Sequence, residues 1–292
     1  MTKPTTTSPP PSPLTPAASS ETGPAGDKAF TGSIPRIYDT YLVPLIFEPY
    51  ARDLVDRLAT LQPARILELA AGTGVVTRAM AARLPAEVSI VATDLNQAML
   101  DQAAAVGTAR AVTWQQADAL RLPFEAGQFD AVVCQFGSMF FPDKGQAFAQ
   151  VHRVLRRGGV FIFNVWDRLA ANELAATVTD ALATVFPQDP PRFMDRIPHG
   201  YHDAGVIARD LAAGGFTAIP RIETVAARSR AASARIAAVA YCQGTPMRNE
   251  IEARDAARLE AATDAAEEAL SRQFGRGAID AAIQALVVTA VR

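Results

Sequence analysis

The sequence predicts an α/β protein whose core is a doubly wound, mostly parallel, seven-stranded sheet. Two observations lead to this prediction. Between Ile66 and Trp166, short apolar runs alternate five times with segments of helical periodicity, which indicates a parallel sheet with right-handed crossovers. The first apolar run leads into a glycine loop, Gly72-Thr73-Gly74, and then into a helix, an arrangement typical of a nucleotide-binding cradle.

The composition is that of a globular protein, with 49% hydrophobic and 20% charged residues among 292. A formal net charge of −2 gives no electrostatic basis for binding nucleic acid or an anionic membrane, and we expect neither partner. No apolar run approaches the roughly 20 residues that span a bilayer, so we expect no membrane insertion. The two cysteines, Cys134 and Cys242, form neither a disulfide framework nor a metal site. We therefore expect no metal and a reducing, cytoplasmic location.

Residues 1–28 are predicted to be a disordered tail. They are rich in Pro, Thr and Ser, and they cannot bury enough apolar surface to offset the entropy of ordering. They also lack the apolar core of a secretory signal and the arginine-rich amphipathicity of a transit peptide.

Two helices are expected next. The first begins at Ile34, where Pro35 suits the first turn, and it should end before Pro44. The second should run from about Phe47 to Leu61, because its apolar residues recur at helical spacing.

The glycine loop leaves the nucleotide open. A phosphate loop would need a Gly-Lys-Ser/Thr ending, and no lysine is present. A dinucleotide fingerprint would place Gly or Ala where Thr77 stands. Glu68 ends the buried strand before the loop, and a buried carboxylate needs a cation or strong donors. A ligand with an ammonium and a sulfonium suits Glu68 better than a pyrophosphate does.

The segment Glu68–Gly74 resembles motif I of the class I, S-adenosylmethionine-dependent methyltransferases. That family has an acidic residue followed by Gly-x-Gly-x-Gly, and here Ala70 stands at the first glycine. We expect Ala70 to exclude a strongly positive φ and to narrow the pocket slightly. The resemblance covers about Phe30 to Phe216 plus the last strand, and it is to the broad group that includes quinone-biosynthesis enzymes. It implies S-adenosylmethionine as cofactor, with contacts from Glu68, Ala70, Gly72 and Gly74.

After a helix at about Val75–Leu84, the second strand, Val88–Thr93, ends at Asp94. A carboxylate about 20 residues beyond the glycines can accept hydrogen bonds from both ribose hydroxyls of an adenosine ligand. The alternative is that Asp94 caps the following helix, although Asn96 can do so instead. Leu95 and Met99 should then flank the adenine.

The third strand, Ala111–Gln116, leads to Asp118 and Ala119. By resemblance, Asp118 accepts a hydrogen bond from the adenine amino group, and the Ala119 N–H meets a ring nitrogen. The alternative for Asp118 is a loop aspartate that bonds its own turn.

The fourth strand, Phe129–Gln135, is nearly all apolar, as a central parallel strand should be. By resemblance, Gln135 contacts the methionine end of the cofactor, while Phe136, Met139 and Phe140 form an apolar floor for the acceptor. The alternative is that the three apolar residues belong only to the core.

The resemblance also places the leading helices over the cofactor mouth. We expect Tyr41 to close on the cofactor and Tyr38 to contact the acceptor. The alternative is that both tyrosines pack against the next helix.

The next helix, about Lys144–Leu155, should end in a left-handed C-cap at Gly158-Gly159, followed by the fifth strand, Val160–Trp166. The predicted ligand residues all fall at strand ends, so a single crevice at the carboxyl edge of the sheet is expected.

The second half is predicted to contain helices at about Ala170–Phe186 and Ala204–Ala213, a sixth strand at about Thr217–Ala227 and a last strand at Gln284–Ala290. His199 lies outside these elements and is the candidate general base near neutral pH. The alternative for His199 is a hydrogen bond at a helix entry.

Relatives join the last two strands by a short hairpin, whereas here a long insertion intervenes. We expect helices at about Ser233–Tyr241 and Glu250–Phe274, which would form a helical cap at residues 228–279. Residues 29–227 and 280–292 would then form the cofactor-binding domain. Candidate cap residues that line the acceptor pocket are Tyr241, Gln243 and Met247.

The sequence thus predicts methyl transfer from S-adenosylmethionine to a small-molecule acceptor, at an O, N or C atom, mainly by alignment in a water-excluded pocket. One alternative is a non-catalytic cofactor-binding or scaffold protein on the same fold. Another is a nicotinamide-dependent oxidoreductase, which Thr77 and Glu68 disfavour. No Asn-Pro-Pro-Tyr-like motif of nucleic-acid amino methylation is present. The sequence does not indicate the oligomeric state.

Overall fold

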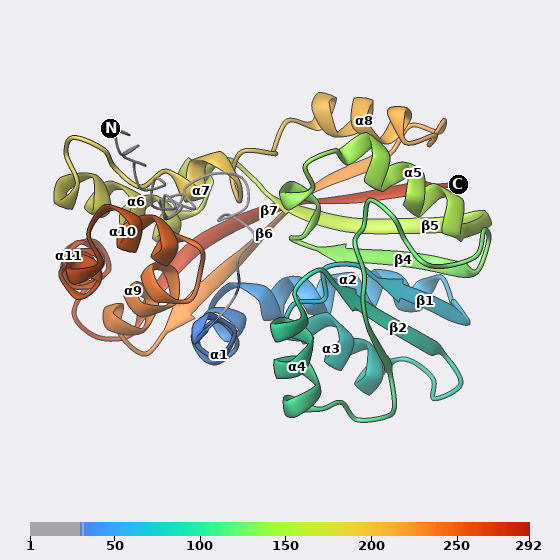
Figure 1. The fold of residues 1–292 in the computed structure, drawn as a ribbon, viewed down its shortest axis with the longest axis horizontal. Coiled ribbons are helices and arrows are strands. Elements are labelled where there is room, and N and C mark those ends of the chain that lie inside the picture. Colours follow the sequence, from blue (N-terminus) through green and yellow to red (C-terminus); the bar gives the residue numbers. More distant parts are fainter. Residues whose placement is uncertain (1–29, 31) are drawn as a thin grey trace, which may run out of the picture.

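The computed structural model describes residue 30 and residues 32–292, so the tail predicted at residues 1–28 lies outside the described residues. The described part of the chain contains a seven-stranded sheet with the order β3-β2-β1-β4-β5-β7-β6 (Figure 1). Strands β1 to β5 pair in parallel, and β7 pairs antiparallel with both β5 and β6. The predicted α/β class and mostly parallel sheet are confirmed.

The parallel strands set the position of a binding edge. Their bounds are β1 Arg65–Glu68, β2 Ser89–Asp94, β3 Thr113–Gln116, β4 Phe129–Gln135 and β5 Leu155–Trp166. The chain runs outward from β1 to β2 and β3, and then returns to place β4 on the other side of β1. Loops that leave β1 and β4 therefore diverge at their carboxyl ends, where a crevice forms.

Alternate residues of each strand face opposite sides of the sheet, and helices bury both sides. Ile66 belongs to the core under α2 (Glu48–Thr60) and α3 (Val75–Arg83). Leu67 belongs to the larger core that includes α5 (Lys144–Val154) and α8 (Ala204–Ala213). Helix α4 (Gln97–Val106) follows β2. The sheet is thus covered on both faces, as a parallel sheet requires.

The leading helices differ from the prediction. A short α1 (Ile34–Ile37) continues without a break into a π-helical segment, η2 (Tyr38–Phe47), and then into α2. Pro44 lies inside η2, so the predicted stop before Pro44 is wrong. Proline has a helical φ and removes only one N–H bond, and burial of its neighbours Val43 and Leu45 offsets that loss.

The glycine pair after α5 also has a different role. Helix α5 ends at Val154, and its C-cap residue Leu155 has an extended backbone, so the predicted glycine C-cap is wrong. Strand β5 already begins at Leu155, and its pairing with β4 shifts between Phe129 and Ala131. Gly158 has a φ of +71° and lies in the extra residues of this bulge. The glycines therefore accommodate an irregular strand start.

Strands β6 (Arg221–Ala231) and β7 (Ile279–Val291) form a long antiparallel pair that reaches from the sheet into a group of helices (Figure 1). We call this group the helical cap, and it comprises α6 (Glu173–Val185), α7 (Phe193–Arg196), α9 (Ala234–Gln243), α10 (Met247–Asp255) and α11 (Leu259–Phe274). Helix α11 packs against α6 and α9, and α9 contacts η2. Helices from before β6 therefore join those inserted between β6 and β7.

Some details of this half depart from the prediction. The single helix expected at Glu250–Phe274 is two helices, separated by a 3-10 turn at Ala256–Arg258. Strand β6 begins at Arg221 rather than Thr217, and helix α7 was not predicted. None of the helices in the described range is both long and apolar enough to cross a membrane.

Candidate functional site

A cavity of about 990 Å³ lies at the carboxyl ends of β1, β2, β3 and β4. We call it the cofactor cavity. Loops after four different strands contribute to its wall, as expected for a crevice at the switch point of the sheet. Most of the predicted cofactor residues line it: Ala70, Gly72, Asp94, Leu95, Met99, Asp118, Ala119 and Gln135.

The loop after β1 adopts a backbone that the sequence did not reveal. Ala70 has a φ of +51°, so the expectation that alanine excludes a positive φ here is wrong. The flanking amides are fixed, because Leu69 N–H donates to the Val133 carbonyl and Ala71 N–H donates to the Thr93 carbonyl. These bonds hold Ala70 in a left-handed conformation that costs an L-residue roughly 1–2 kcal/mol.

Glu68 does not line the cofactor cavity, and its contact with a cofactor remains a prediction. Its carboxylate is buried and accepts a hydrogen bond of 2.5 Å from the Thr77 hydroxyl on α3. Burial raises the pKa of Glu68 to about 8. The sequence suggested that a ligand would supply the hydrogen-bond donor for the Glu68 carboxylate. In the structure Thr77 supplies it, and the sequence did not predict this role of Thr77.

Two further predicted cofactor residues lie away from the cavity walls. Gly74 begins α3 with a φ of +86°, and an added Cβ would lie 2.8 Å from the Trp114 ring, so this glycine permits close packing. Tyr41 is half-buried in η2 and packs against the core. The structure agrees with the packing alternative for Tyr41, and the cofactor contacts of Gly74 and Tyr41 remain predictions.

Asp94 connects two loops at the cavity wall. One carboxylate oxygen accepts from the Gly72 N–H at 2.9 Å, and the other accepts from the Asn96 N–H at 2.8 Å. Burial raises the pKa of Asp94, and these backbone donors act against that rise. Asn96 stands at the N-cap of α4, but its side chain makes no capping bond, so that expectation is wrong. Asp94 is thus held rigidly and retains acceptor capacity toward the cavity.

Asp118 bonds its own turn, as the loop alternative predicted, and it also lies at the cofactor cavity. Its Oδ1 accepts from the Leu120 N–H at 2.9 Å. Met99 is buried while Leu95 is 47% exposed, so Leu95 stands at the outer edge of the cavity. The adenine contacts of these residues remain predictions.

Gln135, the last residue of β4, carries the polar atom that tests the fit of a cofactor. Its Nε2 donates to the Phe47 carbonyl at 3.3 Å. Its Oε1 is buried and has no hydrogen-bond partner among the described residues. A buried acceptor without a donor is costly, and an ammonium group in the cavity would satisfy it. The residues therefore fit a ligand with both a nucleoside and an amino-acid end.

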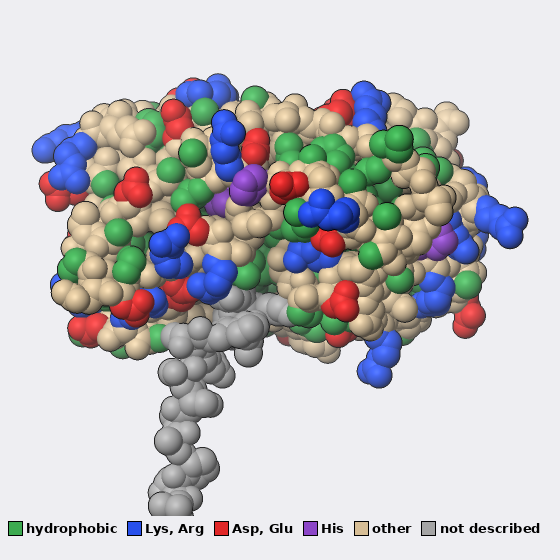
Figure 2. Space-filling view, turned by 90° about the horizontal axis from the view of Figure 1, so that it is seen from above, with side chains coloured by type: hydrophobic (Ala, Val, Ile, Leu, Met, Phe, Trp, Pro, Cys, Tyr) green, Lys and Arg blue, Asp and Glu red, His purple; other side chains and the backbone are tan. Residues whose placement is uncertain are grey.

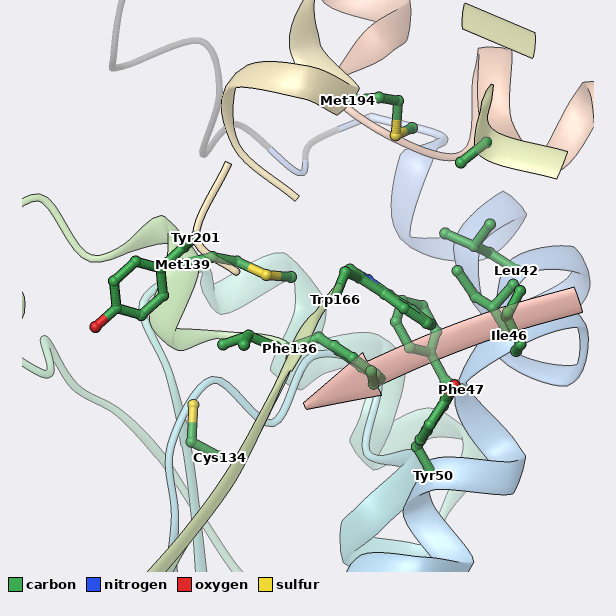
Figure 3. Close-up of a cluster of buried hydrophobic side chains, with 14 of the residues drawn as sticks. Leu42, Ile46, Phe47, Tyr50, Cys134, Phe136, Met139, Trp166, Met194 and Tyr201 are labelled. Carbon is green, nitrogen blue, oxygen red and sulfur yellow. The ribbon is translucent and has the colours of Figure 1, made fainter. Parts of the chain in front are cut away.

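A second cavity, of about 540 Å³, adjoins the first and shares Phe30, Tyr38, Phe136 and Phe140 with it. We call it the acceptor cavity. The acceptor and catalytic residues predicted outside residues 228–279 line it: Tyr38, Phe136, Met139, Phe140 and His199. Figure 3 shows the surrounding hydrophobic cluster, in which side chains of η2, β4 and β5 meet Met194 of α7. The predicted binding residues from widely separated parts of the chain therefore meet here.

The cap contributes less to this wall than the sequence predicted. Tyr241 lines the acceptor cavity, but Gln243 and Met247 do not. Gln243 donates to the Thr263 hydroxyl at 3.1 Å, and Met247 is fully buried. In their place, Phe193 and Met194 of α7 line the cavity. No helical periodicity marks a four-residue helix, which is why this contribution was missed.

Phe136 stands between the two cavities in a constrained conformation. It has a φ of +50°, which is rare for a bulky residue. Its N–H donates to the Asn164 side-chain oxygen at 2.9 Å, and its ring stacks on Trp166. Trp166 lines the acceptor cavity and was not predicted as a site residue; its place at the end of β5 was the available signal.

His199 is buried at the wall of the acceptor cavity. Its Nδ1 lies 2.8 Å from the Asp167 carbonyl oxygen, and since a carbonyl can only accept, Nδ1 carries the proton. Burial lowers the pKa of His199 to about 4, so the ring is neutral near pH 7. The hydrogen bond expected at a helix entry is instead made to the residue that follows β5.

Three features define the class I methyltransferase fold in this structure. They are a seven-stranded sheet with one antiparallel strand, a glycine loop after β1, and an acidic residue at the end of β2. Residues 66–159 match the family model described as a methyltransferase domain. Residues 66–159 therefore form a methyltransferase domain of the class I, S-adenosylmethionine-dependent type.

Two curated relatives illustrate the sequence similarity. A demethylmenaquinone methyltransferase from Deinococcus radiodurans is 40% identical over 99 residues, which are 33% of this chain and 41% of the relative. The ubiquinone/menaquinone biosynthesis C-methyltransferase UbiE from Citrifermentans bemidjiense is 33% identical over 146 residues, which are 46% of this chain and 60% of the relative. The matched part spans about half the length of such relatives.

Solved structures share the fold. The YcgJ protein from Bacillus subtilis has a TM-score of 0.51 at 16% identity, covering 84% of this chain and 98% of that one. The [4+2]-cyclase SpnF has a TM-score of 0.50 at 17% identity, covering 84% of this chain and 81% of that one. At these identities the similarity establishes the fold alone, and function has to be argued from the site.

Proposed function

We propose that this protein transfers the methyl group of S-adenosylmethionine to a small-molecule acceptor. The observation that carries the proposal is the junction of the two cavities. The cofactor cavity has polar groups suited to a nucleoside and an ammonium, whereas the acceptor cavity is mainly aromatic and adjoins it through shared walls. A methyl group presented at the junction can meet an acceptor from the other side.

The bound cofactor would supply an activated methyl group on a sulfonium. In this proposal Asp94 binds the ribose hydroxyls, Gln135 Oε1 accepts from the ammonium, and Asp118 contacts the adenine. Phe136 and Trp166 fix the wall between the cavities. The surrounding apolar side chains exclude water, so alignment of the acceptor supplies much of the catalysis.

The proposed acceptor is small and is not a nucleic acid. The described residues that line its cavity include no Lys, Arg, Asp or Glu, so nothing there neutralises a phosphate. On the face shown in Figure 2, positive and negative side chains are interspersed, which offers no broad basic surface. The quinone-biosynthesis names belong to relatives, and transfer to a quinone precursor is one form of this proposal.

We further propose that residues 29–227 and 280–292 form the cofactor-binding domain and that residues 228–279 are an insertion on the acceptor side, which α6 and α7 of that domain join to complete the helical cap. Contact of Tyr241 with the acceptor cavity supports this division. A cytoplasmic location is also proposed. It is supported by Cys134 and Cys242, both of which are buried and free.

Calorimetric titration with S-adenosylmethionine, its demethylated product and NADH tests the cofactor. We expect saturable binding of the first two and none of NADH. Mass spectrometry of reactions with candidate acceptors then tests transfer. Binding of NADH alone, or of no ligand by the folded protein, would contradict the proposed function.

A further inference from the structure

The walls of the acceptor cavity restrict the chemistry of its occupant. Rings from η2, β5, α7, α9 and the segment that follows β4 surround it, including Phe47, Phe136, Trp166, Phe193 and Tyr241. Aromatic walls favour a planar apolar molecule through stacked and edge-to-face contacts. An ammonium or carboxylate would lose its hydration without gaining an opposite charge from the described wall, so the occupant should be uncharged.

His199 adds one polar group to the wall of the acceptor cavity, and its role as hydrogen-bond donor or acceptor is fixed. The Asp167 carbonyl holds the proton on Nδ1, which leaves a lone pair on Nε2. Nε2 has no hydrogen-bond partner among the described residues. His202 cannot reverse this tautomer, because its own Nδ1 contacts the His199 carbonyl at 2.8 Å. His199 therefore offers the cavity an acceptor, and the matching group on an occupant is a donor.

A hydroxyl is a donor that is uncharged at neutral pH and agrees with an aromatic occupant. An aliphatic amine would enter the cavity as an ammonium, and no described carboxylate lines the wall to stabilise it. Transfer to a ring carbon would instead require a base to remove the proton that this carbon carries. Among the described residues lining the cavity, His199 is the one side chain with a basic nitrogen that can receive the proton a reacting group releases.

We propose that the acceptor is a planar aromatic alcohol, methylated on its hydroxyl oxygen while His199 Nε2 takes up the hydroxyl proton. The inference rests on the proposed function and names its substrate class. An oxygen lone pair forms the new bond to the methyl carbon, and the carbon–sulfur electron pair returns to sulfur. The O–H electron pair stays on oxygen as the proton passes to Nε2. His199 then releases this proton to solvent when the product leaves.

Binding of simple probes to the protein saturated with the demethylated cofactor tests the hydrogen-bond sense. The probes are 2-naphthol, which can donate, and 2-methoxynaphthalene, which has the same rings and can only accept. We expect 2-naphthol to bind at least about tenfold more tightly. Equal affinity, or tighter binding of 2-methoxynaphthalene, would overturn the inference without requiring any variant.

The variant His199→Asn isolates the role of Nε2. Its side-chain nitrogen can keep the bond to the Asp167 carbonyl, while the position of Nε2 becomes empty. We expect the preference for 2-naphthol to fall to about one, with cofactor affinity and circular dichroism unchanged. An undiminished preference in the folded variant would contradict the role of His199.

Product analysis with S-adenosylmethionine and 2-naphthol tests the transfer step. Formation of 2-methoxynaphthalene supports it, and a C-methylated naphthol would overturn it. If the wild-type protein does not bind the cofactor at all, the proposed function itself is contradicted, and not only the inference about the acceptor. Cofactor binding and methyl transfer to another acceptor, without any preference for 2-naphthol, would remove only the inference about the aromatic alcohol.

Discussion

The rings of Phe136 and Trp166 stack with their centroids 3.8 Å apart and 5° between their planes. Phe136 directly follows β4, Trp166 ends the neighbouring parallel strand β5, and both residues line the acceptor cavity. This stack holds Phe136 in its left-handed conformation, so a strained backbone stands where the two cavities meet.

Loss of this stack should be costly. We expect Trp166→Ala to lower the free energy of unfolding by about 3–5 kcal/mol, because it removes a buried ring from a dense aromatic cluster. Trp166→Phe keeps a ring to stack on and should cost less than about 1.5 kcal/mol. Urea denaturation measures both values. Similar losses in the two variants would show that the stack itself contributes little.

Ala70 and Gly137 should be coupled. An added Cβ on Gly137 would lie 2.4 Å from the Ala70 Cβ and 2.8 Å from the Cys134 sulfur. We expect Gly137→Ala to destabilise the protein by about 1–3 kcal/mol through overpacking. Ala70→Gly should stabilise it by roughly 0.5–1 kcal/mol, since glycine adopts a positive φ without strain.

The double variant tests this pair. Ala70→Gly should recover part of the cost of Gly137→Ala, which a double-mutant cycle of unfolding free energies measures. Strictly additive changes in the free energy of unfolding would indicate that there is no steric coupling between the two positions.

The difference between Ala70 and Asp94 shows what the sequence could predict. Asp94, Asp118 and Gln135 end or follow parallel strands, and the carboxyl ends of such strands meet at one edge, so topology alone brought them to one cavity. The φ of Ala70 depends on bonds to β2 and β4 that no local pattern encodes.

The orientation of Glu68 was equally hidden. Its strand is buried at Ile66, Leu67 and Glu68 alike, so no alternation in the sequence indicates which face Glu68 occupies. The acceptor side was predictable only in part, because its walls come from η2, β5, α7 and α9, which carry no shared motif.

Asp94 should be required for cofactor binding. We expect Asp94→Asn to raise the dissociation constant of the demethylated cofactor by about 10- to 100-fold, because a charged acceptor for the ribose is replaced by a weaker one. Calorimetry measures the change, and thermal unfolding reports whether the loops are intact. Asp203→Asn is the matched control, since Asp203 accepts from a backbone N–H at the start of α8 and lines neither cavity. Unchanged affinity in folded Asp94→Asn would remove Asp94 from the site.

Glu68 should make stability depend on pH above neutrality. Burial raises the pKa of Glu68 to about 8 in the folded state, from a model-peptide value of 4.5. The folded protein therefore retains a proton that the unfolded chain releases, and stability falls as the pH rises toward 8. Between pH 6.5 and 8 this contribution amounts to about 2 kcal/mol. His199 titrates mainly below this window, because burial lowers its pKa to about 4.

Glu68→Gln tests the pH effect, since glutamine has a similar shape and does not titrate. We expect the variant's unfolding free energy to decline less than that of the wild type between pH 6.5 and 8, as measured by urea denaturation at each pH. Thr77→Val is the companion variant: it removes the 2.5 Å hydrogen bond to Glu68 and keeps the β-branched shape. Loss of this donor disfavours the carboxylate further, so the pKa of Glu68 should rise and its titration should move to higher pH. Parallel pH profiles for wild type and Glu68→Gln would mean that Glu68 is already ionised in the folded protein.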